Sequence, residues 1–68
     1  MPDWAKIYYF LVFQDESGEW RWNFQAPKHR KVASSGEGYK HRTDCEGAIE
    51  LLKTQGPFAP IGYPPKNK

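Results

Sequence analysis

The 68-residue sequence predicts an α+β domain, a β(3)-α-β unit in which an antiparallel sheet packs on one helix. Two periodic patterns carry this prediction. Residues 19–26 alternate between apolar and polar side chains, and this period of two indicates a half-buried strand. Residues 45–52 place apolar side chains at positions i, i+3, i+4 and i+7, which is typical of an amphipathic helix.

The first expected strand covers residues 5–14, which are rich in the β-branched and aromatic residues that strands prefer. Both of its faces are apolar, so we expect it to be covered on both sides or paired at an interface. Residues 15–18 are typical of a turn, with Gly18 suited to a left-handed conformation. One face of the strand carries Ile7, Tyr9, Leu11 and Phe13, and the other carries Tyr8, Phe10 and Val12.

The second expected strand, residues 19–26, directs aromatic side chains to one face and polar side chains to the other. Pro27 favours the second position of a type I turn, and a short third strand at about residues 31–34 completes a meander. We expect one aromatic face that forms the core or a dimer interface. Its members are Tyr9, Phe13, Trp20, Trp22 and Phe24.

The expected helix has two candidate starting points. Thr43 with Glu46 three residues later matches a capping box, and the alternative is a start one turn earlier, near His41. Gly56 is suited to end the helix, and Pro57 prevents its resumption. The apolar stripe is built from rather small side chains, which complement the bulky aromatic residues of the sheet. The stripe consists of Cys45, Ala48, Ile49 and Leu52.

Residues 5–61 are expected to form one domain, after an extension at 1–4 and before a flexible Pro- and Lys-rich tail at 62–68. Prolines limit residues 58–61 to at most a short edge strand. Cys45 is the only cysteine, and with His29 and His41 it falls short of the four ligands of a zinc cluster, so we expect no metal and no cofactor.

The length and charge of the chain restrict its partners. A chain of this size buries only ~60% of its unfolded surface, so oligomerisation is the expected source of further buried area for its eleven aromatic residues. The net charge of +2 is small for a nucleic-acid-binding domain. No signal peptide is predicted, and the longest apolar stretch, residues 7–13, is too short to cross a bilayer. A lone cysteine fits a cytoplasmic protein.

Three segments resemble the YegP-like family, a bacterial and archaeal domain of unknown function numbered 1508. They are the run Gly18 to Trp22, the run Ala33 to Tyr39, and Cys45-Glu46 with Ile49-Glu50 and Lys53. The resemblance implies a β(3)-α-β fold in which two units assemble around a shared sheet, so a chain with one repeat is expected to form a homodimer. It implies no established activity. The sequence departs from the family where Lys28-His29 replaces an Asn-Gly pair and where Lys31 replaces an apolar residue.

The glycine-rich corner before the helix is a candidate anion site. Backbone amides, the helix dipole and three basic side chains could hold a phosphate or carboxylate there. The alternative, which we favour, is that the two glycines only permit a tight turn. The candidate residues are Gly36, Gly38, Lys40, His41 and Arg42.

A second candidate is a nucleic-acid surface, in which Trp20 and Trp22 would stack on bases and nearby cations would contact phosphates. The cations are Arg21, Lys28, Arg30 and Lys31. Arg21 is expected on the face opposite the tryptophans, which separates the two halves of such a site.

Cys45 lies on the apolar stripe of the helix, where a small buried side chain is expected rather than a nucleophile. The carboxylates show no pairing that suggests acid–base catalysis. The sequence therefore favours a non-enzymatic cytoplasmic homodimer with an interaction or accessory role. Weak nucleic-acid binding and anion binding at the glycine corner are the alternatives.

Overall fold

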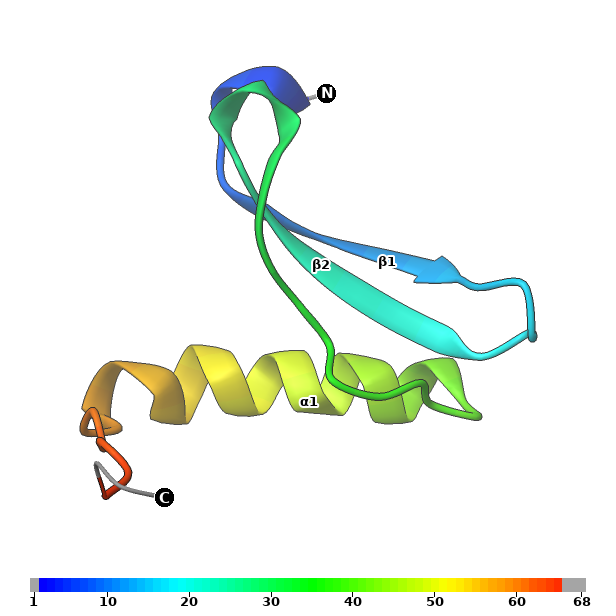
Figure 1. Ribbon diagram of the computed structural model, residues 1–68. Helices are drawn as coiled ribbons and strands as arrows, with labels where there is room; N and C mark the ends of the chain where they lie inside the picture. The colour runs from blue at the N-terminus through cyan, green and yellow to red at the C-terminus, as the bar shows by residue number, and fades with distance from the viewer. Residues whose placement is uncertain (1, 66–68) are drawn as a thin grey trace.

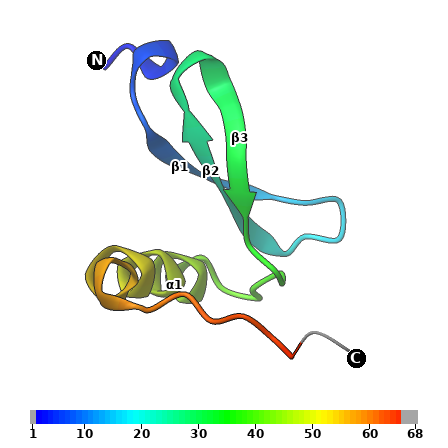
Figure 2. The same cartoon turned by 60° about the vertical axis from the view of Figure 1, so that its left-hand side comes forward.

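The computed structural model describes residues 2–65 and shows a three-stranded antiparallel sheet beside one helix (Figures 1 and 2). The sheet has the order β1-β2-β3, so β2 is its central strand. The expected α+β class, with an antiparallel sheet and a single helix, is confirmed. The elements are β1 (Tyr9–Gln14), β2 (Trp20–Ala26), β3 (Arg30–Ser34) and α1 (Arg42–Gln55), with three single 3₁₀ turns, η1 (Trp4–Lys6), η2 (Pro27–His29) and η3 (Gly56–Phe58).

The register of β1 on β2 decides which aromatic residues face α1. Val12 pairs with Trp22 and Phe10 pairs with Phe24, so Phe10 and Val12 lie on the face that packs against the helix. Phe13 pairs with Arg21 on the opposite face. Tyr9 shares that opposite face, since it pairs with Gln25.

The prediction of one aromatic face is therefore wrong for two of its five members. Trp20, Trp22 and Phe24 face α1, whereas Tyr9 and Phe13 lie on the other side of the sheet. Both faces of β1 are apolar, so its composition did not distinguish them. A shift of one residue in register exchanges the faces of a strand, and the length of the β1–β2 turn sets that register.

The core is small and lies where the first turns of α1 cross the start of β2. Trp22, Cys45 and Ile49 are buried together. The bulky indole packs against small helical side chains, the complementarity of volumes expected from the sequence. Five partly buried side chains surround this cluster: Phe10, Val12, Trp20, Phe24 and Tyr39.

The β1–β2 turn follows the prediction. Gly18 has a φ of +89°, a left-handed conformation that residues with a side chain rarely adopt. Its backbone N–H donates to the Asp15 carbonyl at 3.0 Å, and the Asp15 N–H donates to the Glu19 carbonyl at 2.8 Å. The turn thus closes the hairpin immediately before β2 begins at Trp20.

The β2–β3 turn differs from the prediction. Lys28 and His29 have φ values of +68° and +59°, so they are the two central residues of a primed turn, and Pro27 precedes them instead of taking the second position of a type I turn. The last paired residues of the two strands are Ala26 and Arg30, so three residues form the connection and two of them are left-handed.

The helix begins at Arg42, with His41 as its N-cap residue, so the earlier of the two expected starts is confirmed. The capping box at Thr43 does not form, because that residue is already inside the first turn. Glu46 instead pairs with Arg42, at 3.6 Å between Oε2 and Nε. The helix ends at Gln55, and the N–H of the following Gly56 donates to the Leu52 carbonyl.

The expected final strand is absent from the described part of the chain. Phe58 closes η3, and residues 59–65 form neither helix nor strand. A strand needs a hydrogen-bonding partner, and both views place this segment on the side of α1 away from the sheet (Figures 1 and 2). Of the expected flexible tail, residues 66–68 lie outside the described residues.

Trp4, assigned to the N-terminal extension, packs edge-on against Tyr9 with ring centroids 4.9 Å apart.

Lys28 provides a test of the primed turn. A left-handed conformation costs a residue with an ordinary side chain roughly 1–2 kcal/mol, and asparagine tolerates it better. We expect Lys28→Asn to raise the free energy of unfolding by about 0.5–1 kcal/mol in urea denaturation. Lys28→Val should lower it, because a β-branched residue is poorly suited to positive φ. Equal stabilities for these two variants would contradict the assigned turn.

Candidate functional site

An apolar groove opens between the sheet and the second half of α1. The sheet rises away from the helix toward the β2–β3 turn (Figure 1), and two adjoining cavities of about 460 and 280 Å³ lie in the opening. They share Trp22 and Leu52 in their walls. The first is also lined by Tyr39, Ala48, Leu51, Gln55, Gly56 and Ala59, and the second by Phe10, Phe24 and Ala33. We call this surface the apolar groove.

The walls of the apolar groove are incompletely covered. Leu51, which the sequence analysis left outside the helical stripe, is 64% exposed, and its neighbour Leu52 is also exposed. The spacing of Leu51 from Ala48, one helical turn earlier, was the signal that could have found it. Large apolar side chains on both sides of an open groove are typical of interaction surfaces and ligand-binding grooves.

Two polar groups stand at the base of the apolar groove. The Trp22 Nε1 is buried and meets no acceptor at hydrogen-bonding geometry among residues 2–65. Burial raises the pKa of the Tyr39 hydroxyl. A donor without an acceptor is costly when buried, so an incoming carbonyl group would be stabilised here.

The C-terminal segment that follows α1 exposes several large apolar side chains to solvent. Phe58 is 83% exposed, Ile61 is 79% exposed and Tyr63 is 84% exposed. Single exposed apolar residues are normal on protein surfaces, but three within six residues form a continuous apolar edge. We call residues 58–63 the C-terminal arm.

The glycine-rich corner is a close backbone approach between the start of β2 and the segment that leads to α1. Trp20 and Tyr39 exchange two backbone hydrogen bonds, at 2.7 and 2.8 Å. Beside them, a Cβ on Gly38 would lie 2.9 Å from the Glu19 Cβ, whereas a Cβ on Gly36 would meet nothing within 4 Å. Gly38 is thus required for the corner itself.

The basic residues of this corner have structural partners or face solvent. The Arg42 guanidinium lies 5.9 Å from the Trp20 ring centroid and also pairs with Glu46. His41 supplies the backbone carbonyl that begins the helix, and it is exposed, as is Lys40. Anion binding by this corner remains a prediction without further support from the geometry.

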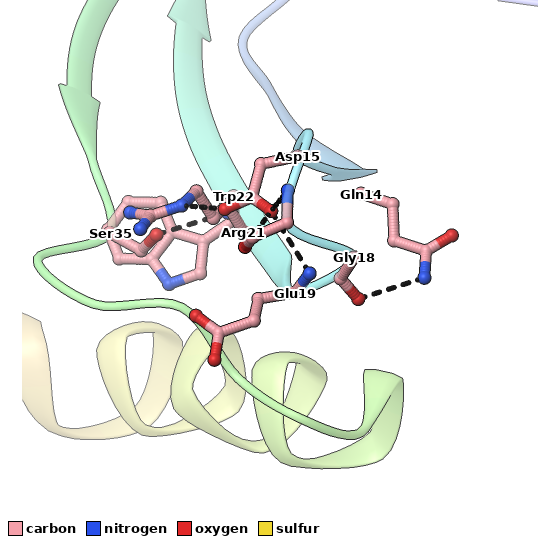
Figure 3. Close-up of polar contacts among 8 residues, drawn as sticks. Gln14, Asp15, Gly18, Glu19, Arg21, Trp22 and Ser35 are labelled. Atoms are coloured by element: carbon pink, nitrogen blue, oxygen red, sulfur yellow. Dashed lines mark hydrogen bonds and ion pairs between the residues drawn. The ribbon is translucent and has the colours of Figure 1, made fainter.

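The β1–β2 turn contains a polar network centred on Asp15 (Figure 3). One carboxylate oxygen accepts hydrogen bonds from the Ser17 N–H, the Ser17 hydroxyl and the Glu19 N–H at 2.7–3.0 Å. The other accepts from Arg21 Nε at 2.6 Å. These bonds, led by those from Ser17 and Arg21, hold the pKa of Asp15 well below its usual range.

This network separates Arg21 from the rest of the expected nucleic-acid surface. Arg21 lies at the β1–β2 end of the sheet, while Lys28, Arg30 and Lys31 lie at the β2–β3 turn. Trp22 is buried against α1, and Trp20 is partly buried against the same cluster with the Arg42 guanidinium near its ring. The structure therefore does not bring these six residues into one site, although it groups three of the cations.

A further polar cluster at the β2–β3 turn escaped the sequence analysis. The Tyr9 hydroxyl and His29 Nδ1 are hydrogen-bonded at 2.8 Å, and Gln25 Nε2 donates to the His29 carbonyl at 3.2 Å. Gln25 is buried, and its Oε1 meets no donor within the described chain. Because Tyr9 lies 20 residues before His29 in the sequence, no local motif marked the cluster.

Within residues 2–65 we find no cluster of side chains arranged for metal binding, and the only thiol is buried. Cys45 is buried in the core, and burial raises the pKa of its thiol, which makes it a weak nucleophile. Among residues 2–65, no three side chains of the metal-binding types lie close enough to hold an ion. No helix in this range has the length and apolar character needed to cross a membrane.

The fold and the apolar groove define a small α+β domain with an open apolar surface between its sheet and its helix. The family described as a domain of unknown function (DUF1508) matches residues 15–62 by its sequence profile. The chain belongs to this family, as its tryptophan and glycine motifs predicted.

Relatives and a solved structure agree with this assignment. The chain is 38% identical over 53 residues to a UPF0339 protein of Neisseria meningitidis serogroup B, covering 78% of this chain and 93% of the relative. It is 40% identical over 53 residues to a UPF0339 protein of Agrobacterium fabrum, covering 78% and 84%. A solution structure of a protein from Haloferax volcanii matches 87% of this chain and 98% of its own, with a TM-score of 0.79 and 29% identity.

Gly38 and Gly36 form a matched pair for testing the corner. We expect Gly38→Ala to lower the free energy of unfolding by about 1–2 kcal/mol, because its Cβ would displace Glu19 and strain the neighbouring backbone pairing. Gly36→Ala should change it by less than about 0.5 kcal/mol. Denaturant unfolding measures both, and a loss at Gly36 as large as that at Gly38 would contradict the proposed contact.

The low pKa of Asp15 predicts an acid-sensitive contribution to stability. A carboxyl group whose pKa is lowered by folding stabilises the folded state above its unfolded pKa of about 3.9 and loses that contribution as the pH falls toward the folded value. We expect Asp15→Asn to be less stable than the parent chain at pH 7. The difference should shrink below pH 4, as thermal unfolding across this range would show, and a constant difference would refute the assignment.

Proposed function

We propose that this protein is a non-enzymatic interaction module that works as a homodimer, in which a second copy covers the apolar groove. The observation that carries the proposal is the coexistence, in one chain, of an open apolar groove and an uncovered C-terminal arm. An assembly that buries both removes a large apolar area from water, which is the main favourable contribution to most protein association.

The dimensions of the chain support this proposal. A folded monomer of 7.9 kDa is expected to expose about 4,400 Å², but this chain exposes 5724 Å². The excess is comparable with the roughly 800 Å² that each partner buries in an interface of standard size. The radius of gyration is 14.3 Å, against about 11 Å for a compact domain of this length.

The C-terminal arm is the segment best suited to enter the apolar groove of the partner. Only Ala59 of the arm lines the groove of its own chain, and the rest of the arm leaves α1 on the side away from the sheet (Figure 2), so its large apolar side chains stay exposed. Its apolar side chains match the lining of the groove, and its backbone carbonyls supply acceptors of the kind that the Trp22 Nε1 lacks. The two-fold symmetry of a homodimer would fill both grooves at once.

The biological setting that fits these features is cytoplasmic. The only cysteine is buried in the core and forms part of it as a thiol, which suits a reducing compartment. The buried thiol and the scattered carboxylates support a non-enzymatic role. An accessory protein that presents its remaining surfaces to other molecules is the role most consistent with this arrangement.

Leu51 offers a direct test of the dimer. In a monomer this exposed side chain could become lysine with little effect, but in the proposed interface the charge would be buried without a partner. We expect the parent chain to sediment as a dimer at micromolar concentration and Leu51→Lys to weaken association at least tenfold.

Gly47→Lys is the matched control, because it adds the same charge at an exposed helix position outside the groove lining. It should leave the dimer intact. A parent chain that sediments as a stably folded monomer, or equal dissociation of the two variants, would refute the proposal.

A further inference from the structure

The end of the sheet farthest from α1 (Figure 1) combines unpaired positive charge with exposed aromatic surface. There η1 lies beside the β2–β3 turn, at the top of Figure 1. We infer that this end binds single-stranded nucleic acid, with phosphates on the cations of the turn and a base against Trp4. The inference does not depend on the proposed dimer.

Charge is concentrated at this end. Lys28, Arg30 and Lys31 are exposed, and none of them forms an ion pair within residues 2–65, whereas Lys6 pairs with Asp3 at 3.8 Å. Four cations and one carboxylate give this end a formal charge of +3. The whole chain carries +2, so everything else together carries −1. An anionic ligand is therefore attracted to this end of the protein more than to the rest of its surface.

The turn holds its cations in a conformation that their residue types do not favour. Lys28 and His29 are both left-handed, and strained backbone of this kind persists where the surrounding structure holds it. Here the Tyr9 hydroxyl bonds to His29 Nδ1, and Gln25 Nε2 bonds to the His29 carbonyl. A hydroxyl that donates to Nδ1 leaves Nε2–H as a further donor on an exposed ring.

Aromatic surface adjoins these donors. Trp4 packs edge-on against Tyr9 and remains 44% exposed. Together with Phe10 and Leu11 the two rings line a cavity of about 270 Å³ beside the free edge of β1. Tyr9 bonds to the turn through His29, so the cavity and the cations belong to one connected surface.

A ring-lined cavity next to a row of cations matches the alternation of bases and phosphates along a single strand. An acidic peptide would form ion pairs with the cations, but its carboxylates would not fill the ring-lined cavity beside Trp4. A duplex is less well suited, because the bases it would offer to Trp4 are stacked inside it. The observations thus favour a single strand over these alternatives.

Binding can be measured by the fluorescence anisotropy of a labelled oligo(dT) and a labelled oligo(U), each of about 12 nucleotides. We expect dissociation constants in the micromolar range. Three phosphate contacts on a single strand predict that affinity falls about 20-fold when the salt rises from about 50 to about 200 mM. No anisotropy change up to about 100 μM protein would overturn the inference.

Two variants separate the charged and aromatic contributions. The triple variant Lys28→Asn, Arg30→Gln, Lys31→Gln keeps residues that the turn and the exposed strand tolerate, and it should weaken binding at least tenfold and remove most of the salt dependence. Trp4→Ala should weaken binding about tenfold while the salt dependence stays unchanged, because stacking involves no counterion. Unchanged affinity of the Trp4→Ala variant would refute the proposed stacking of a base on Trp4.

The matched control removes three cations elsewhere, by Lys40→Gln, Arg42→Gln and Lys53→Gln. It should change affinity less than twofold, and a loss equal to that of the first triple variant would place binding outside this end. Competition by poly-glutamate as strong as that by unlabelled oligo(U) would overturn the choice of ligand. Sedimentation of the first triple variant should match the parent chain, so failure of this site and failure of the dimer are distinguishable.

Discussion

The packing of Trp22 against the small side chains of α1 is the contact on which the rest of this fold depends. Trp22 lies on the central strand, and the helix can approach it closely because it presents Cys45 and Ile49 there. A chain of this length has few other apolar groups to bury, so this contact fixes where the helix crosses the sheet. Ser35 supports the same point, since its N–H donates to the Trp22 carbonyl at 2.8 Å.

That single crossing point explains why the molecule is open elsewhere. Beyond the buried cluster the sheet and α1 diverge, which leaves Leu51 and Leu52 facing a groove instead of a core. The conformational entropy lost when so short a chain folds leaves little surplus stability for uncovered apolar surface. In the dimer that we propose, a second copy buries this surface.

The two hairpin turns show different solutions to the same geometric problem. The β1–β2 turn uses Gly18 for its left-handed position and holds the loop with Asp15. The β2–β3 turn places Lys28 and His29 in left-handed conformations and holds the loop from outside, through Tyr9 and Gln25. The first turn is held by hydrogen bonds among its own residues. The second is held by side chains of β1 and β2, and it carries exposed cations.

The sequence by itself determined the elements whose signals are local. The alternation in β2, the left-handed glycine at position 18, the apolar stripe of α1 and the ending of the helix near Gly56 all follow from period and residue type. The family motifs followed from the same residues. These features depend on neighbours a few positions apart, so a single sequence contains the information needed to find them.

Only the tertiary structure decided the features that depend on distant residues. Register placed Tyr9 and Phe13 on the face away from Trp22, because both faces of β1 are apolar and composition could not choose between them. Within residues 2–65, the absence of a final strand follows from where the helix ends relative to the sheet edges. The grouping of Trp4, Tyr9 and His29 follows from the contacts of β1 with the β2–β3 turn. Each of these depends on contacts between segments far apart in sequence, which local patterns do not encode.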